Sequence, residues 1–445
     1  MLPFVAIVIN MFMFATAVPF IRSSLDLPAD STSWLVAAYT VPNVVFMPFY
    51  GIWGDSVGKR RLLFSGLACF GVGSLICLAS RSFDSIIIGR IIQGFGAASV
   101  TPLGISIIYE FTAEDKVGTM LGTWHMMGPV ASTTGPILGG LIIDSFGWRS
   151  VFLPVSIVTA ITLICLLLLI PKDNRRSQVS TIVRTFDWPG LFFVAGALTF
   201  LVFFISSRPI TGRPPFRDWR LLIAAVGFSA ALYCRERRLA RPYFSFQHLA
   251  VANFRTATLC VAARMVVLGG VNFLIPLYAS EVRRLPASSV GLIIMSHGAG
   301  FLFTMRLSGI LADRWSSKWP PRMGLALQAL LLAVLTVLPA EAPLALLVVC
   351  LAAHGAASGL SLASLNFAAM RDINPAETGS AAGLYAMLRF SGNLFGATFA
   401  GILLRYGLEV YESPLEAYQT AFLALIVAAL VGFAAAFKLN DAVPD

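Results

Sequence analysis

The chain has 445 residues, of which 57% are hydrophobic and only 12% are charged, and its formal net charge is +10 at pH 7. Soluble domains carry about 25% charged residues, so this chain has too few to cover the surface of a water-soluble protein. The composition therefore excludes a soluble enzyme and a disordered chain. The basic residues stand in short clusters between apolar runs, which is typical of membrane loops and argues against a nucleic-acid partner.

A membrane-spanning helix needs about 20 mostly apolar residues. The chain contains fourteen such runs, which are continuous rather than alternating and so exclude spanning β-strands. The sequence predicts an all-α integral membrane protein with fourteen transmembrane helices, of which the eighth is the shortest. The runs are 2–21, 33–52, 62–79, 85–108, 117–143, 150–170, 187–206, 219–234, 256–280, 287–311, 323–339, 343–366, 380–404 and 419–438.

Basic residues and cysteines set further expectations. With the N-terminus inside, the inner loops hold 18 Lys and Arg residues and the outer loops hold 10. Basic residues accumulate in cytoplasmic loops, so we expect both termini in the cytoplasm and a multi-pass protein of the cell inner (plasma) membrane. The six cysteines lie inside apolar runs without a CxxC or a His-containing metal spacing. We therefore interpret them as buried thiols and expect no metal site.

Two similar segments stand at corresponding places in the chain. Residues 51–60 end the second run and residues 309–318 end the tenth, with Gly, Asp and a closing basic residue at the same offsets. Superposing them predicts an N-terminal six-helix half over 1–170, a linker with two inserted helices over 171–255, and a C-terminal six-helix half over 256–445. Parallel repeats of this kind are typical of transporters whose substrate site lies between the halves.

Several short motifs occur in order on successive runs and loops. They are Gly51-Ile52-Trp53-Gly54-Asp55-Ser56-Val57-Gly58-Lys59-Arg60, Arg90-Ile91-Ile92-Gln93-Gly94, Gly135-Pro136-Ile137-Leu138-Gly139-Gly140, Gly147-Trp148-Arg149 and Arg389-Phe390-Ser391-Gly392. Together they resemble the major facilitator superfamily, in particular its fourteen-helix drug:proton antiporter branch. The resemblance covers nearly the whole chain. It implies the major facilitator fold and alternating access, with a proton gradient as the energy source.

The first motif contains a candidate conformational latch. Asp55 ends a helix before a tight loop in which Gly58 permits unusual dihedral angles. Its carboxylate can accept hydrogen bonds from a neighbouring helix N-terminus or from the basic residues that follow. The partial recurrence at Asp313 favours a latch over a simple positive-inside anchor. The candidate latch residues are Gly51, Asp55, Gly58, Lys59, Arg60, Asp313 and Arg314.

Two further motifs are expected to take part in the same conformational coupling. Glycine and proline in the fifth run interrupt the helix's backbone hydrogen bonds and let neighbouring helices approach closely. Ordinary packing of small residues is the alternative interpretation. Arg90 lies inside a run, where a charge is costly and marks a functional candidate, with snorkelling to the outer interface as the alternative. The residues concerned are Arg90, Gln93, Gly94, Gly135, Pro136, Gly139 and Gly140.

The acidic residue that the resemblance implies in the first helix is missing. The family pattern there is D-x-T-x-x-N-V-A-L-P, and its Asp falls on Asn10, which cannot titrate. All 22 acidic residues fall in loops or at run ends, and Asp144 is the closest to an interior. A cationic substrate would meet no counter-charge in the membrane core. An anionic or zwitterionic substrate would meet Arg264, Arg389 or a protonated histidine.

Candidate substrate-binding residues are the polar and aromatic side chains inside the runs. An intramembrane histidine is more often a packing residue than a ligand, and most aromatic residues must face lipid or core. The candidates are Asn10, Phe14, Tyr39, Asn43, Trp124, His125, Arg264, Asn272, His297, His354, Asn366, Arg389 and Asn393.

The sequence thus predicts a secondary active transporter, a proton-linked exporter of a small and anionic organic molecule. An uptake carrier or facilitator of an organic anion on the same fold is one alternative, and a transporter-like membrane receptor is another. The chain has no GxxxxGK[ST] loop and no carboxylate dyad or nucleophile beside a base in its core, so we expect no enzyme. We expect no cofactor, a monomer in the lipid bilayer, and a small-molecule substrate as the partner.

Overall fold

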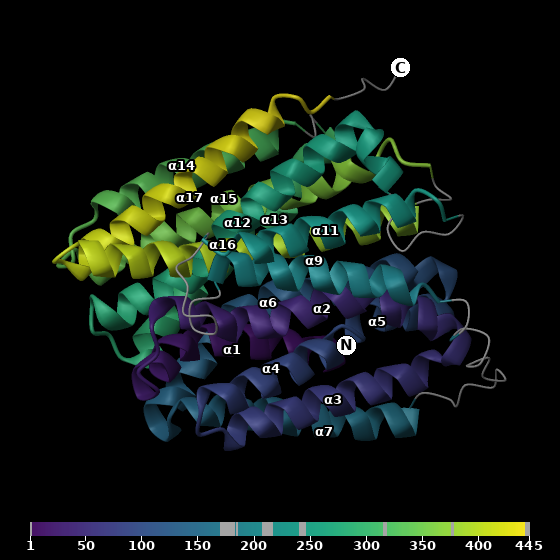
Figure 1. The fold of residues 1–445 in the computed structure, drawn as a ribbon, viewed down its shortest axis with the longest axis horizontal. Coiled ribbons are helices and arrows are strands. Elements are labelled where there is room, and N and C mark those ends of the chain that lie inside the picture. The colour runs from purple at the N-terminus through teal and green to yellow at the C-terminus, as the bar shows by residue number, and fades with distance from the viewer. Residues whose placement is uncertain are drawn as a thin grey trace.

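A computed structural model describes the protein over residues 2–169, 183, 186–206, 217–239, 246–314, 318–374 and 378–440. Within these residues every regular element is a helix, and the long helices lie side by side in one bundle (Figure 1). Thirteen helical segments among them are long and apolar enough to cross a membrane, with Phe83–Phe111 counted as one segment. The predicted all-α membrane fold is therefore confirmed.

The first part of the chain forms seven α-helices and one 3₁₀ turn. The predicted run 85–108 is two helices, because the Ser99 N–H donates to the Gly96 carbonyl three residues back and tightens the backbone there. The bounds are α1 Leu2–Ser24, α2 Ala29–Val57, α3 Lys59–Ala79, α4 Phe83–Ala97, α5 Val100–Phe111, α6 Glu114–Phe146, η1 Trp148–Val151 and α7 Phe152–Leu169.

The middle of the chain forms a helix pair that packs on the bundle. Helices α9 (Trp188–Ser206) and α11 (Trp219–Glu236) lie against each other, and α9 also contacts α2. An ion pair of 2.7 Å between Arg235 and Asp187 joins the pair. Helix α11 occupies the shortest predicted run and carries three charged residues, so it is the one predicted span that is not among the thirteen clear ones.

The last part of the chain forms six long helices after the short turn η2. The longest buried stretch belongs to α12, which packs on α15, α16 and α17. The bounds are η2 Phe246–Ala250, α12 Ala252–Glu281, α13 Ala287–Arg314, α14 Trp319–Val337, α15 Leu344–Met370, α16 Thr378–Val410 and α17 Pro414–Ala436.

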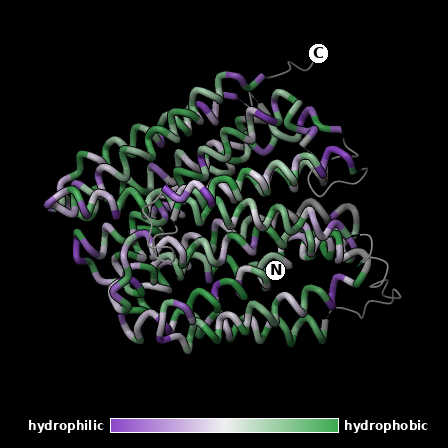
Figure 2. Tube along the Cα trace, in the orientation of Figure 1, coloured by the Kyte–Doolittle hydropathy of each residue, from purple (hydrophilic) through white to green (hydrophobic). Residues whose placement is uncertain are grey.

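The distribution of hydropathy fits a bundle that sits in lipid. Hydrophobic residues follow the helix bodies, whereas hydrophilic residues gather towards the helix ends (Figure 2). Large apolar side chains such as Leu168, Phe303 and Val337 are at least 75% exposed. In water such a surface would drive aggregation, whereas in a bilayer it contacts acyl chains at no cost.

Helices α1–α7, here the N-terminal group, and helices α12–α17, here the C-terminal group, meet along a few helix pairs. The main contacts between the groups are α6 with α13, α2 with α16 and α1 with α12. Between the groups lie the cavity and the polar links described below.

Candidate functional site

Small residues bring α6 and α13 into close contact between the two groups. A Cβ added to Gly140 would lie 2.3 Å from the Ala287 carbonyl oxygen, and one added to Gly291 would lie 2.3 Å from the Pro136 carbonyl oxygen. Gly139 faces the Met13 backbone of α1. The glycines of the fifth-run motif therefore let three backbones approach closely, with Pro136 inside the helix between them.

We expect the Gly140→Ala substitution to destabilise the protein by about 1–3 kcal/mol, because the added methyl group overlaps backbone that cannot rotate away. Thermal unfolding of the detergent-solubilised protein measures the effect. The matched control is Gly128→Ala on the same helix, where nothing lies within 4 Å of the added Cβ. Equal melting temperatures for the two variants would contradict this account of the interface.

Three polar links join the groups at one end of the bundle, which we call the linked end. Arg22 of α1 forms an ion pair with Glu281 of α12. The Asp30 carboxylate at the start of α2 forms an ion pair of 2.7 Å with Arg405 of α16. The Asp144 carboxylate at the end of α6 accepts the backbone N–H groups of Ala287 and Ser288 at 2.8 Å, and so caps the N-terminus of α13.

The loop motif lies at the opposite end of α2. Gly58 has φ of +110°, as expected for a glycine that lets α2 turn directly into α3. Lys59 forms an ion pair of 2.7 Å with Glu110 of α5, and Arg60 donates 2.6 Å to the Leu167 carbonyl near the end of α7. These contacts tie the turn to its own group. The side chains of Asp55, Asp313 and Arg314 lie outside the described residues.

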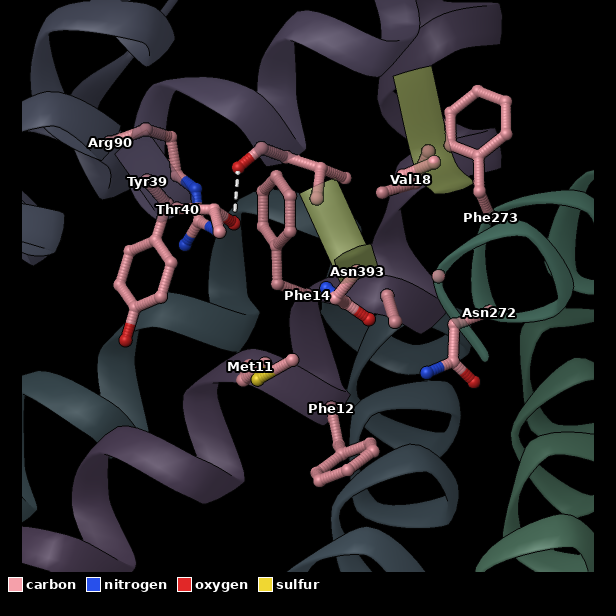
Figure 3. A pocket seen from close by; sticks show the side chains of 14 residues that line it. Met11, Phe12, Phe14, Val18, Tyr39, Thr40, Arg90, Asn272, Phe273 and Asn393 are labelled. Atoms are coloured by element: carbon pink, nitrogen blue, oxygen red, sulfur yellow. Dashed lines mark hydrogen bonds between the residues drawn. The ribbon is translucent and has the colours of Figure 1, made fainter. Parts of the chain in front are cut away.

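A cavity of about 50 Å³ lies between the two groups. It is lined by residues of α1, α2, α4, α12 and α16, and Asn272 and Phe273 face it from the C-terminal group (Figure 3). Pockets for drug-sized ligands measure roughly 300–1,000 Å³, so the groups must separate before such a molecule enters. The lining residues are Met11, Phe12, Phe14, Ala15, Val18, Val36, Tyr39, Thr40, Arg90, Gly269, Asn272, Phe273, Asn393 and Ala397.

Arg90 is the charged member of this lining. Only 2% of the residue is exposed, so it points inward and does not snorkel to an interface. Its guanidinium carbon lies 3.9 Å from the centroid of the Phe14 ring and 4.3 Å from that of Tyr39. Such cation–π contacts stabilise a desolvated guanidinium.

Hydrogen bonds fix Arg90 in place from two sides. Its Nε donates 3.1 Å to the Leu35 carbonyl of α2, and one terminal nitrogen donates 3.1 Å to the Gln93 side chain. Gln93 in turn donates 2.7 Å to Ser74 of α3. These acceptors are uncharged, so the positive charge of Arg90 is not neutralised by them. A Cβ on Gly94 would lie 2.2 Å from the Tyr39 carbonyl oxygen, which explains the glycine that follows Gln93.

The structure brings some predicted substrate residues to the cavity and leaves others elsewhere. Phe14, Tyr39, Asn272 and Asn393 line it. Asn10 and Trp124 are buried but do not, and Trp124 stacks on Phe4 with ring centroids 4.7 Å apart. Asn43, Asn366 and Arg389 also lie outside the lining, and the guanidinium of Arg389 stacks on the Phe390 ring. The side chain of His125 lies outside the described residues.

Arg264, His297 and His354 form a separate buried cluster within the C-terminal group. The two imidazole ring centroids are 5.3 Å apart. Arg264 is fully buried, and its Nε donates 2.9 Å to the Ser358 carbonyl. His297 also lines a second small cavity, which it shares with Asn272. No sequence signal predicts this cluster, because its members come from three helices far apart in the chain.

Sequence reasoning missed most of the apolar cavity lining. Met11, Ala15, Val18 and Val36 have the same residue types as lipid-facing positions, so their composition carries no signal. Thr40 lies one helical turn after Val36 on α2, and its hydroxyl donates a hydrogen bond of 3.0 Å to the Val36 carbonyl. Only the packing of α1 and α2 against α12 and α16 identifies these residues.

The helical bundle, the cavity between its two groups and the close helix crossings at glycine agree with the family that the sequence matches. The sequence profile of the Major Facilitator Superfamily matches residues 3–397. The chain belongs to this superfamily. It is therefore a membrane transporter of the major facilitator type, and members of this family are not enzymes.

Relatives within the superfamily include transporters and drug efflux pumps. The chain is 26% identical to the riboflavin transporter RibZ of Clostridioides difficile (strain 630), over 91% of this chain and 87% of RibZ. It is 28% identical to the drug efflux pump JefA of Mycobacterium tuberculosis, over 87% of this chain and 76% of JefA. It is 27% identical to the multidrug resistance protein Stp of the same species, over 89% of this chain and 73% of Stp.

Proposed function

We propose that this protein is a proton-linked exporter of small organic anions, which bind in the central cavity with their negative group at Arg90. The observation that carries the proposal is the cavity lining, in which Arg90 is the charged residue among aromatic rings and two amides. An anion that entered would gain charge-assisted hydrogen bonds in a low-dielectric site. The aromatic rings would stack on the flat part of an organic molecule.

Two observations support export by alternating access. The relative JefA is named a drug efflux pump, and the relative Stp is named a multidrug resistance protein. Three polar links hold the groups together at the linked end, as a transporter requires if that end opens and closes in turn. An uptake carrier remains the second candidate, because the relative RibZ is named simply as a riboflavin transporter.

The proposal includes a location and an orientation. A monomer in the cell inner membrane with both termini in the cytoplasm would place the linked end on the outer side. The excess of Lys and Arg in the loops at the other end supports this orientation. The two halves would be 1–170 and 256–445, with α9 and α11 as the inserted pair. The proton gradient is the proposed energy source, and no cofactor is proposed.

Flux assays on the purified protein in proteoliposomes test the function. Carboxyfluorescein serves as the anionic probe, riboflavin as the uncharged probe and ethidium as the cationic probe, each measured with and without a pH gradient. We expect carboxyfluorescein flux that increases with the gradient. Robust gradient-driven flux of ethidium without flux of carboxyfluorescein would contradict the anion assignment, and probe binding without any flux would indicate a receptor.

The loop motif supplies a separate test. The Asp55→Asn substitution is expected to lower transport at least tenfold while the protein remains inserted and folded, because it removes a charge without changing the size of the side chain. Flux and melting temperature are measured on the same preparation. Normal flux in this variant would show that the motif only sets the orientation of the protein in the membrane.

A further inference from the structure

A cluster of buried polar groups in the C-terminal group has no role in the cavity just described. It consists of Arg264 on α12, His297 on α13, and His354 and Ser358 on α15. Each of the four is at most 8% exposed, and Arg264, His354 and Ser358 are fully buried. Helices α13 and α15 cross so closely here that a Cβ on Gly355 would lie 1.9 Å from the His297 carbonyl oxygen.

The polar atoms of this cluster are short of partners. Within the described part of the chain, no hydrogen bond is made by Nε2 of His297, either ring nitrogen of His354, the Ser358 hydroxyl or the two terminal nitrogens of Arg264. A buried polar group left without a partner costs about 1–3 kcal/mol, and folded proteins retain few of them. So many in one place indicate that the cluster binds something besides the chain itself.

A second small cavity lies between Asn272 and His297. Asn272 lines the central cavity and also a second cavity of about 10 Å³ that reaches His297. That volume is about the room a single water needs. It is too small for an organic ligand, and its polar lining residues are Asn272 and His297, which are the partners that a single water there would use.

Among the described residues, few charged or titratable groups act on the pair. Arg264 of α12 bonds to the carbonyl of Ser358, one turn after His354 on α15. Its charge acts on both imidazoles, and Arg389 and Tyr385 of α16 act on Arg264. On α14, Gln328 is fully buried and does not titrate. On α6, Ser132 packs against Gly298, the residue after His297 on α13, and the side chain of His125 lies outside the described residues. Imidazole is the group here that ordinarily binds a proton near neutral pH.

We propose that His297 and His354 together bind one proton, which reaches them from the central cavity past Asn272. One imidazole takes the proton and becomes imidazolium, while the second imidazole stays neutral. The positive charge of Arg264 opposes this uptake, and an anion bound at Arg90 or Asn272 favours it. The pair is then the site through which a pH gradient acts on the proposed transport, and in this respect the inference rests on the proposed function.

Nitrogen NMR of the purified, histidine-labelled protein in lipid vesicles tests the site directly, because the chain has only four histidines. We expect the pair to take up a single proton as the pH falls from 8 to 4. In the Arg264→Gln variant we expect the same uptake at a pH higher by about one unit or more, since a nearby like charge has been removed. Arg264→Lys, which keeps the charge, is expected to stay near the wild type.

Two further variants keep the test decisive if Arg264→Gln does not fold. His297→Gln is expected to change the titration of His354, whereas His248→Gln, in η2 outside the cluster, is expected to leave it unchanged. Two outcomes would overturn the proposal. One is no proton uptake by the pair over this pH range, and the other is a titration of His354 that neither Arg264→Gln nor His297→Gln alters.

The flux assay separates this inference from the proposed function. Proton uptake by the pair without flux of any probe would leave the site standing and remove the exporter function. Gradient-driven flux that persists undiminished in the His297→Gln, His354→Gln double variant would leave the exporter standing and overturn the role of the pair in coupling.

Discussion

Replacing Arg90 with Gln is expected to weaken binding of carboxyfluorescein between tenfold and a hundredfold and to lower its flux accordingly. Hydrogen bonds to a charged group are worth about 1.5–3 kcal/mol, and the substitution removes the positive charge from the cavity wall. Riboflavin, which carries no net charge, should lose much less. The measurement is probe binding by the purified protein together with flux in proteoliposomes.

Two controls separate the role of the charge from the role of packing. Arg90→Lys keeps the charge but cannot reproduce the bonds to Leu35 and Gln93, so we expect an intermediate loss. Arg322→Gln removes an arginine whose bonds go to carbonyls at the end of α17, and it should leave probe binding unchanged. An equal loss for carboxyfluorescein and riboflavin in Arg90→Gln would assign Arg90 to structure and not to anion binding.

Breaking the linked end is expected to open the central cavity to that side of the membrane. Asp144→Asn weakens two charge-assisted bonds at the N-terminus of α13, and Arg405→Gln removes the ion pair with Asp30. If each change costs the closed form about 1 kcal/mol or more, the double variant shifts the population at least tenfold towards the open form. The two groups would then separate where α6 meets α13 and where α2 meets α16.

Thiol labelling measures this shift. A cysteine placed at Ala15 in the cavity lining, in a background without the six native cysteines, reacts with a membrane-impermeant reagent only when the cavity is open to the side of addition. We expect labelling from the linked end to be about tenfold faster in the double variant. The control is Lys59→Gln, whose ion pair with Glu110 lies within the N-terminal group. Unchanged labelling in the double variant would show that the links do not hold this end closed.

The cavity and the linked end together explain why so small a cavity fits the proposed function. At about 50 Å³ the cavity holds no drug-sized molecule, and polar contacts close the linked end. Substrate binding then needs free energy to separate the groups. Separating groups that are joined by a few polar links costs less free energy than separating a large apolar interface. The few-kcal/mol scale of such links suits a reversible transition.

The amino-acid sequence by itself determined the membrane class, the helical fold and the superfamily. In lipid, apolar runs of about 20 residues can form all their backbone hydrogen bonds only as helices. This signal is local in the chain, so a single sequence is enough to predict the helices. The glycine at position 58 was predicted from a turn and has φ of +110°. The break between α4 and α5 was not anticipated, because it depends on a single backbone hydrogen bond.

Tertiary structure alone decided which intramembrane charges face the cavity. Arg90 and Arg264 both sit inside apolar runs, yet Arg90 lines the cavity and Arg264 lies enclosed beside two histidines. In a spanning helix, lipid and protein interior are both apolar, so hydropathy does not tell which face meets which neighbour. The pairing of His297 with His354 and of Asp144 with the start of α13 depends on how the helices pack, which no local pattern records.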